Sequence, residues 1–179
     1  MLGMVGLAAW SGQLEQLMSR LLQSDSVGDF AIRGEIWSRA AQAIHDYPLT
    51  GIGMGTFRSV VPELYPYVLS DPAKVHHAHN LYLQAGADLG LPGLVGFAAL
   101  ALCLAALGYV GRRRWAAAGN TTMSWLAVGC LGGLAAILTH GLLDAVTWGT
   151  KPAFVAWAVL GLLLATALTA PVSPPARRV

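Results

Sequence analysis

Charged side chains are scarce in this sequence. Of its 179 residues only 11% are Asp, Glu, Lys or Arg, whereas an ordinary soluble domain has about 25%. Hydrophobic residues make up 55% of the chain. So many apolar side chains require a solvent other than water, and the composition therefore favours a membrane protein over a soluble domain.

Charge is missing altogether from three long stretches. About 20 apolar residues in a helix suffice to cross the hydrocarbon core of a bilayer. The uncharged stretches are Leu91–Gly111, Trp115–Leu143 and Pro152–Ala176, the last apolar as far as Ala170. Together they predict three transmembrane helices in an all-α, polytopic membrane protein.

Two clusters of arginine orient the predicted spans. Arg112–Arg114 closes the first span, and Arg177 with Arg178 follows the third. Basic residues beside short loops tend to stay in the cytoplasm. The first span then enters from outside, and the stretch before Leu91 is expected to be extracytoplasmic.

Cysteine and excess basic charge are also nearly absent. Cys103 and Cys130, the two cysteines, fall inside predicted spans, where no disulfide to an exported loop can form. The net charge of +2 is explained by the arginines that flank the spans. The charge therefore gives no reason to expect a nucleic-acid partner.

The chain divides into four expected segments. Residues 1–10 are apolar but too short for a span, so we interpret them as the end of a truncated transmembrane segment of a longer protein. Residues 11–90 form the extracytoplasmic helical loop, with a short helix expected over 13–23. Residues 91–170 form the three-helix membrane region, and 171–179 a disordered cytoplasmic tail.

The exported loop has one clear helical pattern, between Asp29 as a candidate cap and Pro48 as a terminator. Apolar residues recur there at three and four residue steps, which places them on one helical face: Ile32, Ile36, Ala40, Ala43, Ile44 and Tyr47. Gly51, Gly53 and Gly55 follow at alternate positions. They predict a tight turn, because the spacing does not fit a dinucleotide-binding loop.

Three histidines lie just before the first span, at positions 76, 77 and 79. A metal site is one interpretation, in which His76 and His79 share a helical face and His45, His140 or a distant carboxylate completes the set. A second is that His79 acts as a base, oriented by Asn80, since imidazole titrates near pH 6.5. A third is that His79 only caps the helix that follows. The spacing alone does not decide among them.

Other polar residues have both a functional and an ordinary interpretation. Arg33 has no carboxylate four residues further on, so its guanidinium is a candidate for binding phosphate, although simple solvation fits equally well. Arg39 follows Glu35 by four residues and is expected to form a solvated helical pair. His140 and Asp144, also four apart, are expected on one helical face near the outer end of the second span. Ionisable groups there are functional candidates or pair with each other.

Three stretches of this sequence, in order, resemble a known family. They are "RGEIWSRAAQAIHDYPLTGIGMGTF", "HAHNLYLQAGADLGLPGLVGF" and "HGLLD". Over about Ile32 to Asp144 the chain is similar to the carboxyl-terminal half of the O-antigen ligase and polymerase superfamily of bacterial inner-membrane proteins. The pattern does not separate ligases from polymerases.

The resemblance implies a metal-independent glycosyltransferase with no cofactor. Such an enzyme moves a glycan from an undecaprenyl pyrophosphate carrier to an acceptor hydroxyl, on a lipid or a glycan, at the periplasmic face of the inner membrane. By similarity His79 would be the catalytic base and Arg33 would contact the pyrophosphate. Asn80 and Asp144 would be supporting, substrate-binding residues. Family members have further spans, which would precede Met1. A different class of interpretation is a non-catalytic membrane module that binds lipid headgroups or a partner subunit.

Overall fold

The computed structural model describes residues 26–145, 147–148 and 153–172. All regular structure in this part of the chain is helical. It consists of α2 (Ser26–Asp46), α3 (Phe57–Leu64), a 3-10 turn (Pro72–Lys74), α4 (Leu81–Ala117), α5 (Thr121–His140) and α6 (Ala153–Leu168). The expected all-helical fold is therefore confirmed over the described residues. The expectations for residues 1–10, 13–23 and 173–179 lie outside them.

The helix predicted between Asp29 and Pro48 is α2, and its central apolar face forms a core. Ile36, Ala40 and Ala43 are at most 2% exposed and pack against Phe57 and Val61 of α3. The ends of this face are more exposed, with Ile32 at 37% and Tyr47 at 41%, and Tyr47 lies just beyond the end of α2 at Asp46. The start was misplaced, since α2 begins before Asp29 rather than at it.

The glycine segment forms the predicted turn and packs against α4. Gly51, Gly53 and Gly55 all have positive φ angles, and the amide of Ile52 donates to the carbonyl of Ala87 at 2.8 Å. A Cβ on Gly51 would lie 2.5 Å from the backbone of Asp88. Glycine is required there because two backbones meet with no room for a side chain.

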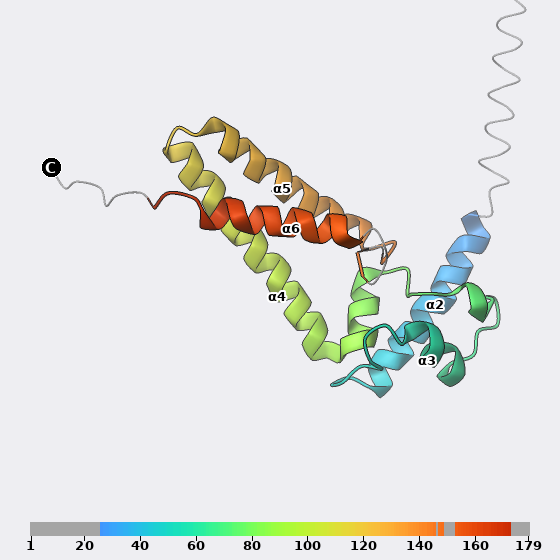
Figure 1. Cartoon of the computed structure of the whole chain (residues 1–179). Coiled ribbons are helices and arrows are strands. Elements are labelled where there is room, and N and C mark those ends of the chain that lie inside the picture. The colour runs from blue at the N-terminus through green and yellow to red at the C-terminus, as the bar shows by residue number, and fades with distance from the viewer. Residues whose placement is uncertain (1–25, 146, 149–152, 173–179) are drawn as a thin grey trace, which may run out of the picture.

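Helix α4 contains a sharp break at Gly90, visible as a bend in Figure 1. Gly90 has φ 70° and ψ −174°, and Pro92 follows it near the start of the second segment. The predicted start of the first span at Leu91 therefore coincides with a new helical segment, although the helix continues past Gly111 to Ala117. Residues 81–89 form the short first segment, which belongs with the polar loop.

Helices α4, α5 and α6 pack together as a bundle (Figure 1). Small residues permit close approach, since a Cβ on Gly108 would lie 2.5 Å from Leu163 and one on Gly111 would lie 2.7 Å from the backbone of Ala167. The outer surface is apolar as well. Leu102 of α4 is 72% exposed and Trp125 of α5 is 68% exposed, as expected of helices solvated by lipid rather than water.

Two helices, α4 and α5, are long and apolar enough to cross a membrane. The third apolar helix, α6, has 16 residues, fewer than the approximately 20 that a span needs. A third span over Pro152–Ala170 therefore stays a prediction. Predicted boundaries also differ from the observed ones, because α5 ends at His140 instead of continuing to Leu143.

Candidate functional site

The polar site lies where the first segment of α4, the end of α5 and helix α2 meet. Asn80 is the N-cap of α4, and its Oδ1 accepts hydrogen bonds from the amides of Tyr82 and Leu83, both at 3.0 Å. The cap of this helix is therefore Asn80, and the interpretation of His79 as the cap was wrong. The Nδ2 of Asn80 donates to the carbonyl of Leu142 at 3.0 Å, which ties the helix start to the segment after α5.

His79 has an unusual backbone conformation. Its φ is 47°, in the left-handed region that non-glycine residues seldom adopt. Two contacts hold it there: its amide donates to Nδ1 of His77 at 3.2 Å, and its carbonyl accepts from Nε1 of Trp37 at 3.4 Å. Strained residues kept by their surroundings are common at functional sites.

Asp144 lies beside the His79 ring. Its Oδ1 is 3.5 Å from Nδ1 of His79 and 3.7 Å from Nδ1 of His77. Helix α5 ends at His140, so Asp144 belongs to the following turn, where its amide donates to the carbonyl of His140 at 3.1 Å. The expectation that His140 and Asp144 share a helical face was therefore wrong, but Asp144 does lie at the level of His79.

Arg33 reaches the same place from α2. Its Nη1 donates to the carbonyl of Leu143, the residue before Asp144. None of the ion pairs between described residues involves Arg33. The structure thus brings together all four predicted site residues: Arg33, His79, Asn80 and Asp144.

Arg39 and Glu35 do not form the expected helical pair. Nη1 of Arg39 donates to Gln42 at 3.2 Å. The Glu35 carboxylate instead accepts from the amides of Val68, Leu69 and Ser70. Partial burial acts to raise the pKa of Glu35, but these hydrogen bonds to its charged form outweigh it and hold the pKa below its usual value. Glu35 therefore fastens the loop at residues 68–70 to α2.

His77 is a site residue that the sequence interpretation missed. Its ring and that of His79 have centroids 4.2 Å apart. The chain is not helical here, so His77 and His79, two residues apart, come together, whereas Nδ1 of His76 contacts the carbonyl of Lys74 at 2.8 Å. The alternate spacing of the two histidines does not by itself predict this contact, because the backbone here is neither helical nor regularly extended and φ of His79 is 47°.

Burial and charge tune both imidazoles. Burial lowers the pKa of His79, the positive charge of Arg33 lowers it further, and the Asp144 carboxylate opposes both effects. Burial and the neighbouring His79 lower the pKa of His77 in the same way. A ring that is neutral near pH 7 has a lone pair available, so His79 is suited to accept a proton.

A large cavity adjoins His77. It has a volume of about 800 Å³, and its wall combines aromatic with polar side chains, among them His76, His77, Gln84, Asp88, Trp148 and Trp157. Asp88 is fully buried, and its carboxylate accepts from Nε2 of Gln84 at 2.9 Å and from Nε1 of Trp148 at 2.8 Å. The cavity wall is therefore fixed by hydrogen bonds.

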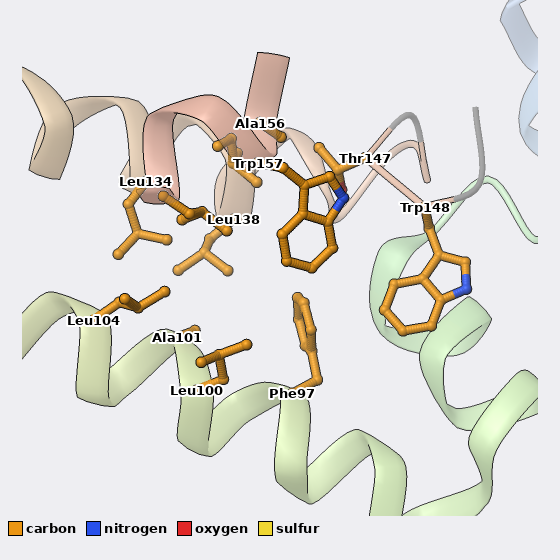
Figure 2. A pocket seen from close by; sticks show the side chains of 12 residues that line it. Phe97, Leu100, Ala101, Leu104, Leu134, Leu138, Thr147, Trp148, Ala156 and Trp157 are labelled. Atoms are coloured by element: carbon orange, nitrogen blue, oxygen red, sulfur yellow. The ribbon is translucent and has the colours of Figure 1, made fainter. Parts of the chain in front are cut away.

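A second pocket lies between the three apolar helices. Figure 2 shows Phe97 and Leu104 of α4, Leu134 of α5 and Trp157 of α6 around it. Its volume of about 30 Å³ and its mainly apolar lining leave room for no more than a very small molecule. This pocket is a narrow gap in the bundle and holds none of the predicted site residues.

Apolar helices that expose hydrophobic side chains, with a polar site at one end of the bundle, are typical of a membrane protein. The profile of the O-antigen ligase family matches residues 1–98, and the chain belongs to this family. No curated protein matches it. Membership indicates an enzyme of the ligase or polymerase type, with lipid and lipid-linked glycan partners. The match includes Arg33, His79 and Asn80 but ends before Asp144. The fold brings Asp144 next to His79.

Proposed function

We propose that the protein transfers a glycan from an undecaprenyl pyrophosphate carrier to an acceptor hydroxyl, at the periplasmic face of the bacterial inner membrane. The observation that carries the proposal is the convergence of Arg33, His79 and Asp144 from three separate parts of the chain. Such a transfer needs a base for the acceptor hydroxyl and a positive charge for the leaving group.

His79 acts as the base in this proposal. With Asp144 near Nδ1, the proton of the neutral ring resides on Nδ1, and Nε2 carries the lone pair that takes the acceptor proton. The negative charge of Asp144 then stabilises the imidazolium that forms. The separation of 3.5 Å is longer than a well-formed hydrogen bond, and substrate binding is expected to shorten it.

Arg33 binds the pyrophosphate. A guanidinium has five donors in a planar fork, and the contact with Leu143 uses one of them. Its remaining donors can hold phosphate oxygens while negative charge develops on the leaving group. Asn80 is a positioning residue. Its amide side chain links the start of α4 to Leu142 and so sets the distance between His79 and Asp144.

The cavity beside His77 accommodates the sugar portion of a substrate. Aromatic rings such as those of Trp148 and Trp157 offer flat apolar faces, and His76, Gln84 and Asp88 bring polar atoms to the same wall. Pockets of about 300–1,000 Å³ with this mixture are usual for small-molecule ligands. The alternative, a non-catalytic module that binds lipid headgroups or a partner subunit, needs neither a base nor its carboxylate.

The test is complementation of a strain that lacks the gene, with glycan transfer measured on the cell envelope. We expect His79→Ala to reduce transfer by about 10²–10⁴-fold, the usual contribution of a general base. The matched control is His45→Ala, since the His45 side chain is 88% exposed and far along α2 from Arg33. Transfer at the wild-type level by His79→Ala, with equal amounts in the membrane, would favour the non-catalytic module.

A further inference from the structure

His77, His79 and Asp144 also form a cluster of metal-binding groups. One ring nitrogen of each histidine and one carboxylate oxygen lie within 4.8 Å of one another. All three side chains are partly buried, and Nδ1 of His79 is shielded from solvent without a hydrogen-bond partner in the described residues. The cluster thus combines three potential ligands with an imidazole nitrogen that has no other partner.

The donor set and spacing suit zinc. Zn²⁺ binds imidazole nitrogen and carboxylate oxygen at about 2.0–2.2 Å, so the ligand atoms of a tetrahedral site lie about 3.4 Å apart. The Nδ1 atoms of His79 and His77 are 3.5 and 3.7 Å from Oδ1 of Asp144. Two imidazoles do not suit Mg²⁺ or Ca²⁺, which prefer oxygen ligands. Small side-chain shifts would therefore complete three of the four zinc positions.

We propose that His77, His79 and Asp144 bind Zn²⁺, and that the bound ion blocks transfer by occupying the base. The blocking rests on the proposed function, whereas the binding does not. A neutral imidazole has one ring nitrogen with a free lone pair. Zinc at Nδ1 of His79 takes that lone pair and leaves the proton on Nε2. Zinc at Nε2 coordinates the nitrogen that would accept the proton. Either way His79 cannot accept a proton.

His77 supplies the third ligand of the proposed zinc site. In the ion-free protein its Nδ1 accepts the amide hydrogen of His79. Binding through that atom exchanges the hydrogen bond for a zinc bond. A base assisted by Asp144 alone has no need of a second imidazole at this distance, but a three-ligand zinc site does.

Metal titration of the purified protein in detergent tests the binding. Co²⁺ serves as the visible probe, with Zn²⁺ as the competitor. We expect one ion per chain, with intense tetrahedral absorption that Zn²⁺ displaces. His77→Ala and Asp144→Ala should each weaken binding by at least about tenfold, since second-sphere losses alone cost about 10–100-fold.

The matched control is His76→Ala, which removes the neighbouring imidazole, whose Nδ1 contacts Lys74. It should bind the ion like the wild type. His77→Gln keeps an acceptor for the His79 amide but lacks the imidazole, so it separates lost ligation from lost structure and should also bind weakly. Equal affinity of His77→Gln and wild type, or no binding to the wild type at micromolar Zn²⁺, would overturn the site.

A transfer assay tests the blocking separately. Zn²⁺ should inhibit wild-type transfer at concentrations that match its measured dissociation constant, and a chelator should restore the rate. Stoichiometric binding without inhibition would overturn the blocking. A wild-type protein that binds zinc but never transfers glycan would count against the proposed function and leave the metal site standing.

Discussion

Asp144 lies 3.5 Å from the ring of His79, although the two residues are separated by both membrane-length helices. The contact exists because α4 and α5 run as an antiparallel pair, which returns the chain to the level where α4 begins (Figure 1). The hydrogen bond from the Leu81 amide to the Gly141 carbonyl, at 2.7 Å, fixes the two ends together. The packing of the apolar bundle thus sets the geometry of the polar site.

Substitution of Arg33 tests its contact with pyrophosphate. Lysine keeps the charge but loses the planar fork. Hydrogen bonds to charged groups contribute about 1.5–3 kcal/mol, so Arg33→Lys should reduce transfer by about tenfold or more and raise the KM for the lipid-linked donor. The measurement is steady-state transfer with purified donor. Arg39→Lys, on the same helix, is the control and should stay within about twofold; wild-type kinetics for Arg33→Lys would exclude the assigned contact.

Gly90 should be indispensable to the fold. A Cβ there would lie 2.7 Å from the Pro48 carbonyl, and φ is 70°. Backbone strain of this kind costs about 1–3 kcal/mol before the clash is counted, so Gly90→Ala should lower the thermal unfolding midpoint in detergent. Gly96→Ala is the matched control, because a Cβ at that position would meet no atom within 4 Å other than those of its chain neighbours and its own helix backbone. Equal midpoints for the two variants would show that the break at Gly90 is not needed.

The orientation of the chain can be measured by cysteine labelling in intact cells. In a background without Cys103 and Cys130, Val68→Cys should react with a membrane-impermeant maleimide, because Val68 is 83% exposed in the loop expected outside. Ala118→Cys, in the connection between α4 and α5, should react only after permeabilisation. The positive-inside rule predicts this result from the arginines next to Ala118. The reverse pattern would place the site in the cytoplasm.

The sequence predicted the helical class, the buried centre of α2, the glycine turn and the start of a helical segment at Leu91. Each depends on a local pattern in the sequence. The pattern is apolar periodicity for α2, glycine at alternate positions for the turn, and the absence of charge for the segment that begins at Leu91. His77 was missed because its approach to His79 depends on a non-helical backbone and a φ of 47°, which spacing alone does not encode. The predicted pairing of Glu35 with Arg39 was wrong for a related reason. Glu35 instead binds the loop at residues 68–70, which lies more than 30 residues further along the chain.

Asp144 was predicted as a supporting residue at the level of His79, but its position beyond the end of α5 was not predicted. The apolar run continues to Leu143, so composition extended the helix, whereas α5 ends at His140. The end is set by tertiary contacts, in which the carbonyls of Gly141 and Leu142 accept from Leu81 and Asn80. Contacts between distant segments of this kind decide the site geometry and leave little trace in a single sequence.

The pH dependence of transfer, compared between the wild type and Asp144→Asn, tests most directly whether His79 is a base oriented by Asp144. Because the base must be unprotonated, the wild-type rate should rise with pH through the pKa of His79, which burial places below the usual value of 6.5. Asp144 raises that pKa, so its neutralisation should move the midpoint to lower pH. The plateau should fall by about tenfold or more as the imidazolium loses its charged partner. An unchanged midpoint and plateau would contradict the account.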